Sequence, residues 1–237
     1  MRLPRPRFLR LGFLRLVLGV GAVALGAPIT IKAAAAADAS EWEPVAQRAV
    51  LYEQDPGNPR GKIFAGSTTW RAETLSIKPA QPPELVIRAT VEIPERQIAM
   101  TWMLAHNNDA GVPASHIVEM QFRLPTQFHA GGIASVPGLW VNQTERTEGS
   151  PLSGLAVKVI PNYFMIALSA DPANRGRNVD LLIGCPWIDV PLVYANKQRA
   201  TLAMDKSAPV ARLFRLAFSA WESDPQIAAP PFAYCGP

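Results

Sequence analysis

The chain has 237 residues, of which 49% are hydrophobic and 18% are charged. This composition excludes an intrinsically disordered chain, because disorder requires few apolar residues and a high density of charge. The 16 glycines and 23 prolines follow no repeat, which excludes collagen and indicates many turns. Two cysteines exclude a disulfide-dense miniprotein and a four-cysteine metal site.

The net charge of +4 originates in an N-terminal leader, residues 1–37. The leader contains six basic side chains and no acidic one, which leaves 17 of the 23 basic residues and all 19 acidic residues from Asp38 onward. The rest of the chain is therefore slightly acidic and has no electrostatic reason to bind phosphate groups. The charge distribution predicts that the protein has no nucleic-acid partner.

The leader has the three parts of an export signal. Arginines are followed by the apolar run Leu16–Ala27 and then by small residues before Asp38. A signal peptide over residues 1–37 is one interpretation, and a retained inner-membrane anchor over residues 11–31 is the other. The apolar run itself is short, because a membrane-spanning helix needs roughly 20 apolar residues. Both interpretations place the rest of the chain in the periplasm.

Three segments predict the fold class. Every second residue is apolar in Glu84–Ile93, Ile98–Ala105 and Ile117–Leu124, as in antiparallel strands with one buried and one solvated face. Hairpin turns are expected at Pro94–Gln97 and, further on, at Pro161-Asn162 and Asn196-Lys197. Further strands are expected over residues 49–52, 62–75, 139–144, 155–160, 163–169, 188–194 and 199–205.

Two helices are expected near the C-terminus. Asp171 is a helix N-cap followed by proline, which predicts a helix ending near Ile183. Apolar residues at three- and four-residue spacing predict a second helix over Pro209–Trp221. We expect a mainly β, antiparallel, sandwich-like domain or curled sheet, with nine or ten strands, over residues 49–221. Residues 38–48 are predicted to be a linker, and residues 222–237 a proline-rich tail.

Five strings in the chain carry a family resemblance: VLYEQDPGNPRGKIFAGSTTWRAET, QPPELVIRATVEIPER, PASHIVEMQFRLP, PLSGLAVKV and WIDVPLVYANKQRATLAMDK. In this order they resemble an uncharacterised family of exported or membrane-anchored domains of alphaproteobacteria, over residues 48–221. The resemblance implies a location behind one N-terminal hydrophobic segment, and it implies no activity. The C-terminal order of helices and strands is also similar to the invasion-associated locus B family, although the cysteines characteristic of that family are missing.

Cys185 and Cys235 are the only thiols. Export would permit a disulfide between them, which would attach the tail to the strand that begins near Trp187. Closing a loop of about fifty residues would contribute roughly 3–4 kcal/mol to stability. The alternative is two unpaired cysteines. Because no Cys-x-x-Cys motif is present, a redox-active pair is not expected.

The three histidines predict no metal site. His106, His116 and His129, with Asp109 or Glu119, match no zinc-ligand spacing. His116 and Glu119 are three positions apart and therefore point to opposite faces of a strand. Only His116 and His129 could meet, at the two ends of one strand. We expect neither a metal nor a cofactor.

Catalytic motifs are also missing from the sequence. The chain has no Gly-x-Ser-x-Gly or Ser-x-x-Lys motif and no phosphate-binding glycine loop. Ser115 and His116 are sequence neighbours whose side chains should point apart on a strand. Glu92 and Glu95 lie at a predicted hairpin, where carboxylates face water. The sequence therefore identifies no catalytic residue.

Tryptophans provide the one indication of a binding surface. Trp70, Trp102, Trp140 and Trp187 fall on four predicted strands. Trp102 lies on an apolar face, which predicts core packing. For Trp70 with Arg71, and for Trp140, two interpretations remain: they pack in the core, or they form an interface, because exposed tryptophan and arginine often anchor protein contacts.

These observations predict a non-catalytic binding or structural module of the bacterial cell envelope. An envelope protein or an apolar ligand is the expected partner, together with the inner membrane if the leader is retained. Two alternatives remain. One is a hydrolase with an unrecognised site, and the other is a carrier that holds an apolar ligand between its sheets.

Overall fold

The structure is a computed structural model that describes residues 43–75, 83–222 and 235. Twelve strands, two α-helices and one short 3-10 helix lie in these ranges. The strands are β1 (Val45–Asp55), β2 (Asn58–Leu75), β3 (Glu84–Ile93), β4 (Ile98–His106), β5 (Ala114–Arg123), β6 (Ile133–Ser135), β7 (Trp140–Asn142), β8 (Ser150–Pro151), β9 (Gly154–Ile160), β10 (Tyr163–Ser169), β11 (Trp187–Tyr194) and β12 (Arg199–Asp205). The helices are α1 (Pro172–Gly184), α2 (Ala208–Trp221) and the 3-10 helix η2 (Pro94–Arg96).

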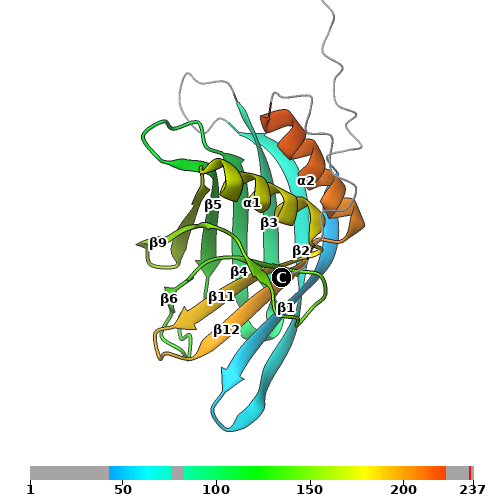
Figure 1. Ribbon diagram of the computed structural model, residues 1–237. Coiled ribbons are helices and arrows are strands. Elements are labelled where there is room, and N and C mark those ends of the chain that lie inside the picture. Colours follow the sequence, from blue (N-terminus) through cyan, green and yellow to red (C-terminus); the bar gives the residue numbers. More distant parts are fainter. Residues whose placement is uncertain (1–42, 76–82, 223–234, 236–237) are drawn as a thin grey trace, which may run out of the picture. The chain divides into compact units, whose positions relative to one another are not determined.

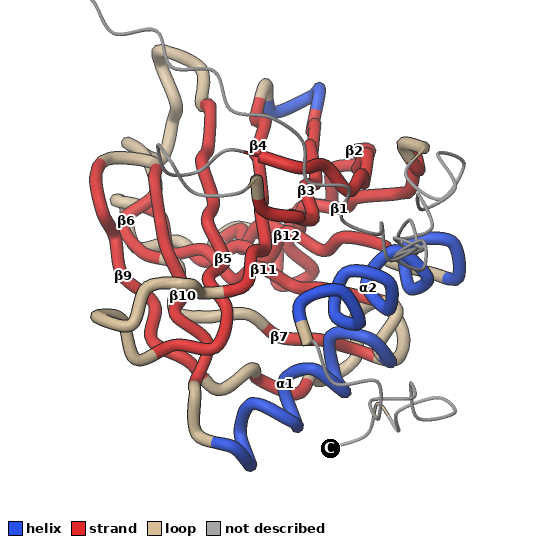
Figure 2. The backbone as a smooth tube through the Cα atoms, turned by 90° about the horizontal axis from the view of Figure 1, so that it is seen from above, coloured by secondary structure: helices blue, strands red, loops and turns tan. Residues whose placement is uncertain are grey.

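All twelve strands belong to one antiparallel sheet. Its order is β8-β7-β11-β12-β1-β2-β3-β4-β5-β10-β9, with β6 beside β11. The sheet curls strongly (Figures 1 and 2), and only Leu152 and Ser153 separate the edge strands β8 and β9 along the chain. The predicted mainly β, antiparallel architecture is confirmed, in the form of a single curled sheet with two helices near the C-terminus.

Short turns explain why consecutive strands pair. The residues Gln97, Asn162 and Lys197 have φ angles of 52°, 61° and 71°, the left-handed conformation that lets a chain reverse between strands. Each of them lies at a turn that the sequence predicted. The strand limits of β3, β10 and β12 also agree with the sequence prediction residue for residue.

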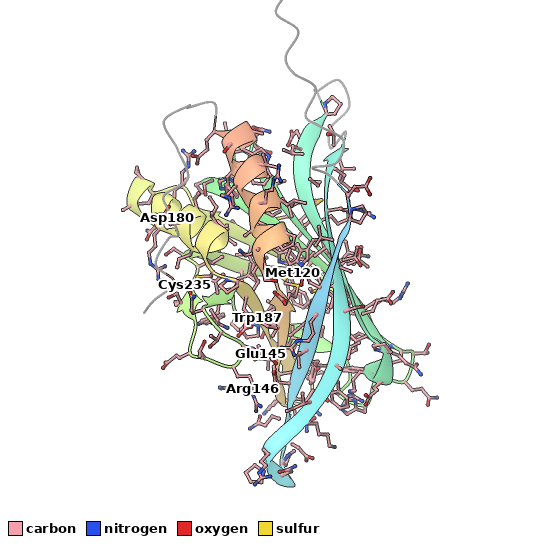
Figure 3. All side chains as sticks on the ribbon, turned by 90° about the vertical axis from the view of Figure 1, so that its right-hand side faces the viewer. Met120, Glu145, Arg146, Asp180, Trp187 and Cys235 are labelled. Atoms are coloured by element: carbon pink, nitrogen blue, oxygen red, sulfur yellow. A yellow bond between two sulfur atoms is a disulfide. The ribbon has the colours of Figure 1, made fainter. Side chains whose placement is uncertain are left out.

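The two helices cover one face of the sheet, which we call the inner face. Helix α2 packs on β2 and β3, and α1 packs on α2 and β10. Figure 3 shows both helices on the same side of the long strands. The centre of this layer is an aromatic cluster in which the Trp70 ring lies 5.5 Å from the rings of both Trp102 and Phe214. Trp70 and Trp102 are fully buried, so this cluster forms the centre of the hydrophobic core.

The predicted disulfide between Cys185 and Cys235 is confirmed. Cys185 follows α1 directly and is fully buried, and it joins Cys235 across 50 positions of sequence. The bridge therefore attaches the C-terminal part of the chain to the end of α1.

Several predicted strand limits differ from the structure, among them the starts of β1, β2 and β5. Strand β1 begins at Val45, four residues before the predicted start of the domain, because Val45–Arg48 pairs with Ser67–Trp70 of β2. The predicted leader and most of the predicted tail lie outside the described residues. Within the described ranges, neither helix is long and apolar enough to cross a membrane.

Candidate functional site

The predicted interface residues do not lie on one surface. Trp70 is fully buried in the core, and its Nε1 donates a hydrogen bond to the Asp205 carbonyl oxygen over 2.9 Å. Arg71 follows it on the same strand, points to the other face and pairs with Glu73. Trp140 is half-buried on β7, which three strands separate from β2. Trp70 therefore packs in the core, and the alternative prediction that it forms an interface is wrong.

A different surface carries exposed apolar side chains. It lies on the face of β9, β10, β5 and β4 that points away from the helices, which we call the outer face. Leu155, Val157 and Val159 of β9 are 67%, 47% and 47% exposed. Solvated strands normally present polar residues on this face, so the pattern requires an explanation beyond the stability of the fold.

Strand register assembles this surface from four strands. Val157 pairs with Met165, Met165 with Glu119, and Glu119 with Met103. The next row continues from Leu155 through Ala167, Ile117 and Ala105 by the same pairings. Side chains directly opposite one another on neighbouring strands lie about 5 Å apart, so each row is a continuous strip. Glu119 is the one charged residue in these two rows between β9 and β4.

The loop between β4 and β5 closes this surface into a pocket, which we call the outer pocket. Its volume is about 240 Å³. The lining residues come from β3, β4, β5, β10 and the loop: Glu84, Met103, Ala105, His106, Asn107, Asn108, Asp109, Val112, Ile117, Glu119 and Met165. The loop holds its shape because the Asn107 side-chain amide donates to the carbonyl oxygens of Val112 and Ala114 over 2.9 and 2.8 Å.

The charge of the outer pocket is negative. Glu84, Asp109 and Glu119 line it, and no lysine or arginine is among the described lining residues. Tyr163 bonds to Glu119, and burial together with this hydrogen bond raises the pKa of the tyrosine above its usual range. The pocket thus combines an apolar floor with a carboxylate rim.

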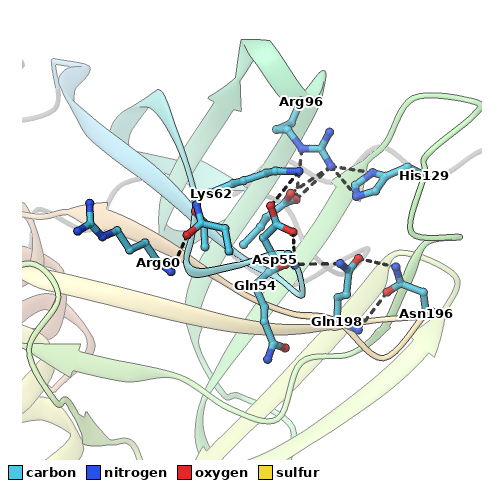
Figure 4. A network of polar contacts seen from close by, with 12 residues as sticks. Gln54, Asp55, Arg60, Lys62, Arg96, His129, Asn196 and Gln198 are labelled. Carbon is cyan, nitrogen blue, oxygen red and sulfur yellow. Dashed lines mark hydrogen bonds and ion pairs between the residues drawn. The ribbon is translucent and has the colours of Figure 1, made fainter.

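A separate polar cluster joins β1, β11 and η2 (Figure 4). The buried Glu53 carboxylate accepts a hydrogen bond from Tyr194 over 2.8 Å and pairs with Arg96 over 3.2 Å. Arg96 also contacts His129 over 2.7 Å, and its guanidinium lies 5.1 Å from the Phe64 ring. Burial and the neighbouring carboxylate raise the pKa of Tyr194. Because the carboxylate is paired within the cluster, this arrangement serves to hold three elements together.

The loop between β7 and β8 folds over the outer face of β1 and β11. Glu145 pairs with Arg48 and accepts a hydrogen bond from Tyr52. The Arg146 guanidinium lies 5.1 Å from the Tyr52 ring, and Arg48 lies 5.3 Å from the Trp187 ring. Figure 3 shows Glu145, Arg146 and Trp187 close together. These contacts cover part of β1 and β11, which β2, β3, β4, β5 and β10 separate from β9 in strand order.

Asp189, in this covered region, has a carboxyl pKa well above the ordinary value. Its side chain accepts a hydrogen bond from Asn142, while burial raises its pKa to about 6. A raised carboxyl pKa in a cleft often marks a catalytic acid. Here burial under the loop accounts for the shift, because Asn142 and Ser150 beside it are themselves buried. The sequence did not indicate this residue, since alternation along β11 provides no information about what covers the outer face.

The histidines are arranged differently from the sequence expectation. His116 lies 5.4 Å from His106, measured between ring centroids, whereas His129 belongs to the Glu53 cluster. Among the described residues, no group of three metal-ligating side chains occurs. Burial lowers the pKa of His116 to about 3, so the ring is neutral at physiological pH.

Ser115 and His116 contact each other, contrary to the prediction that they point apart. The serine Oγ lies 3.2 Å from His116 Nδ1. The register shift opposite them, between Leu168 and Ser169, distorts the strand and brings the two side chains together. His116 is only 1% exposed, so its ring offers no access to a substrate. Glu92 and Glu95 are exposed, as expected for carboxylates at a hairpin.

Lys206 is fully buried at the start of α2. Its Nζ donates to the Ile183 carbonyl oxygen at the end of α1 over 3.5 Å and lies 4.9 Å from the Phe214 ring centroid. Burial lowers the pKa of this amine to about 7. Lys206 therefore connects the two helices, although burial of its amine costs desolvation energy. Nothing in the sequence indicated that this lysine is buried.

Comparison of the chain with protein-family models, curated proteins and solved structures finds no match.

Proposed function

We propose that the protein is a non-catalytic binding module of the bacterial cell envelope, which holds a protein partner through the outer pocket. The observation that carries the proposal is an apolar pocket with a carboxylate rim on the sheet face that points away from the helices. Uncovered apolar surface of this kind is typical of a contact site.

The size of the outer pocket favours a protein over a small apolar ligand. Sites for drug-sized molecules occupy roughly 300–1,000 Å³ and enclose most of the ligand. The outer pocket, at about 240 Å³, is smaller and holds one or two side chains. A carrier with its ligand between two sheets is also a poor fit, because there is one sheet and α2 packs on its inner face.

The charge of the pocket specifies the chemistry of the partner. Apolar atoms of Met103, Ile117 and Met165 match an aliphatic chain, and the carboxylates of Glu84 and Glu119 match a cationic end. Lysine and arginine combine an apolar stem with a charged head. We therefore expect a partner segment in which a basic residue stands among apolar ones.

The envelope location follows from the leader, whose basic residues and apolar run have the pattern of an export signal. Alkaline phosphatase fused to the C-terminus of the full chain is expected to be active in cells, because this enzyme requires export. A fluorescent protein that matures only in the cytoplasm is expected to stay dark at the same position. The opposite pair of results would contradict the location.

Site-specific photo-cross-linking in cells tests the contact. Benzoylphenylalanine replaces Val112, which is 38% exposed at the rim of the pocket, or Ile63, which is 52% exposed on β2 and serves as the control. The probe at position 112 should produce discrete adducts, and mass spectrometry should identify the attached segment as apolar and basic. Adducts shared by both positions, an acidic segment, or no adduct would contradict the proposal.

A charge variant sharpens the same experiment. In Glu84→Gln/Glu119→Gln, the pocket keeps its shape and loses two carboxylates, so the adduct at position 112 should fall several-fold. The matched control is Glu92→Gln/Glu95→Gln, which removes two exposed carboxylates outside the outer pocket. Equal losses in both double variants would show that the pocket charge is irrelevant.

A further inference from the structure

Strand β9 is an edge strand whose apolar side chains lie in the open. Among the described strands it pairs with β10 alone. Leu155, Val157 and Val159 are exposed on its outer face, and Ile160 at its end is 60% exposed. Most proteins protect such an edge, because unpaired backbone groups beside apolar side chains attract another strand.

The hydrogen bonds to β10 determine which backbone groups of β9 stay unpaired. Ser169 N donates to the Ser153 carbonyl oxygen over 2.9 Å. Bonded and non-bonded pairs alternate along an antiparallel ladder, so the residues two and four positions further along β9, Leu155 and Val157, also bond to β10.

The intervening residues, Ala156 and Lys158, consequently direct their N–H and C=O groups away from β10. No described strand pairs with this side of β9. Leu155 and Val157 thus each stand between two residues whose backbone groups point to the open edge. This alternation is the template that another antiparallel strand requires.

We propose that β9 pairs in antiparallel fashion with β9 of a second copy of this chain, with Val157 on the two-fold axis. In this register Ala156 of one copy lies opposite Lys158 of the other, and these two pairs form four backbone hydrogen bonds. Val157 faces its own counterpart, and Leu155 faces Val159. These apolar pairs occupy the non-bonded positions, where the Cα atoms of an antiparallel ladder approach to about 4.5 Å.

The charge on β9 selects this register. Lys158 is the only charged residue of the strand. An axis through Lys158 would place two ammonium groups opposite each other, which is unfavourable. With the axis at Val157, each Lys158 lies opposite an alanine, and its Nζ keeps its bond to the Ile133 carbonyl oxygen over 2.8 Å.

The pairing ends at two copies. A two-fold contact uses the same edge of both subunits and leaves neither available, so it forms a closed dimer. The register shift near Tyr163 and the proline at position 161 prevent extension past Ile160. The other sheet edge, β8, has two residues, one of them a proline. Because an interface based on one short strand is small, we expect a weak dimer.

Cysteine cross-linking of the full chain in cells tests this register, independently of the outer pocket. In Val157→Cys, the new thiols of two copies meet on the axis at a Cα separation of ~4.5 Å, within the range of a disulfide. A brief oxidation should therefore convert most of this variant to a covalent dimer on a non-reducing gel.

Two matched variants serve as controls. In Leu155→Cys the two thiols lie roughly 13 Å apart along the strands, too far to bond. Val112→Cys places a thiol of similar exposure off the strand. Both should yield at least ten-fold less dimer than Val157→Cys, whereas Leu155→Cys/Val159→Cys should restore the cross-link. Equal yields from position 112, or no dimer from position 157, would overturn the proposal.

Removal of one backbone donor separates strand pairing from simple proximity. Ala156→Pro, added to Val157→Cys, deletes an N–H that faces the second copy and leaves the bonds to β10 in place. The cross-link yield should fall several-fold, while the Cys185–Cys235 bridge still forms as a sign of correct folding. An unchanged yield in a folded protein would contradict pairing through the strand edge.

Discussion

Strands β4, β5 and β10 carry apolar side chains on both faces, and the two faces differ in what covers them. On the inner face, Trp102 and Met120 have no exposed surface, because the strands on either side and the two helices enclose them. On the outer face, Met103 and Met165 line an open pocket and stay half-buried. The inner face accounts for the stability of the fold. The exposed apolar side chains of the outer face near β9 do not belong to the core, and they are the basis of the proposed contacts with other molecules.

The largest effect should come from the inner face. Trp102→Ala removes a ring from the centre of the aromatic cluster and leaves a cavity that α2 fills poorly. The free energy of unfolding should fall by roughly 3–5 kcal/mol, measured by urea denaturation of the full chain. Thr101→Ala is the control, because its side chain points to the outer face and should change stability by about 0.5 kcal/mol or less. Similar losses in both variants would contradict the difference between the faces.

Loss of the Cys185–Cys235 disulfide should have the second largest effect on stability. Cys185→Ser/Cys235→Ser releases the C-terminal part of the chain, and the chain-entropy cost of an open loop of this length is roughly 3–4 kcal/mol. Reduction of the native protein with dithiothreitol should lower the free energy of unfolding by the same amount. A double variant as stable as the native protein would show that the bridge contributes nothing to this side of the sheet.

The buried Lys206 should make the free energy of unfolding depend on pH. Lys206 has a pKa of about 7 in the folded chain and an ordinary value of 10.5 when unfolded. Between these values the unfolded chain binds more protons, so stability rises with pH across the window. Lys206→Met should therefore stabilise the protein at pH 7 by ~1–4 kcal/mol, with a smaller gain at pH 10. Lys62→Met, at an exposed position, should show no such trend in the same denaturation series.

The smallest effect on stability should come from the outer face. Val157→Lys places a charge on a side chain that is already 47% exposed, so the free energy of unfolding should change by about 0.5 kcal/mol or less. The dimer proposed above should nevertheless be lost, because two charges would meet on the axis. A loss of stability comparable to that of Trp102→Ala would mean that the outer face is part of the core.

Particular residues show how far the sequence could predict this molecule. Alternation located β3 and β4, and the Asp171-Pro172 pair located the start of α1, where the Asp171 side chain accepts a hydrogen bond from Asn174 N. The short strands β6 and β8 were missed, because strands of two or three residues have no periodicity to detect. The outer pocket was missed for a different reason, since its lining comes from β3, β4, β5, β10 and one loop.

Most of the strands and both helices were recognisable from the sequence alone, because side-chain periodicity and turn residues act over a few positions of chain. The two cysteines of the sequence also indicated the disulfide between Cys185 and Cys235. Which apolar residues are covered depends on how the strands and helices pack in three dimensions. Trp70 and Val157 are both apolar residues on strands, but Trp70 is buried under α2 whereas Val157 is 47% exposed. Burial depends on what packs above each face, which no local pattern records.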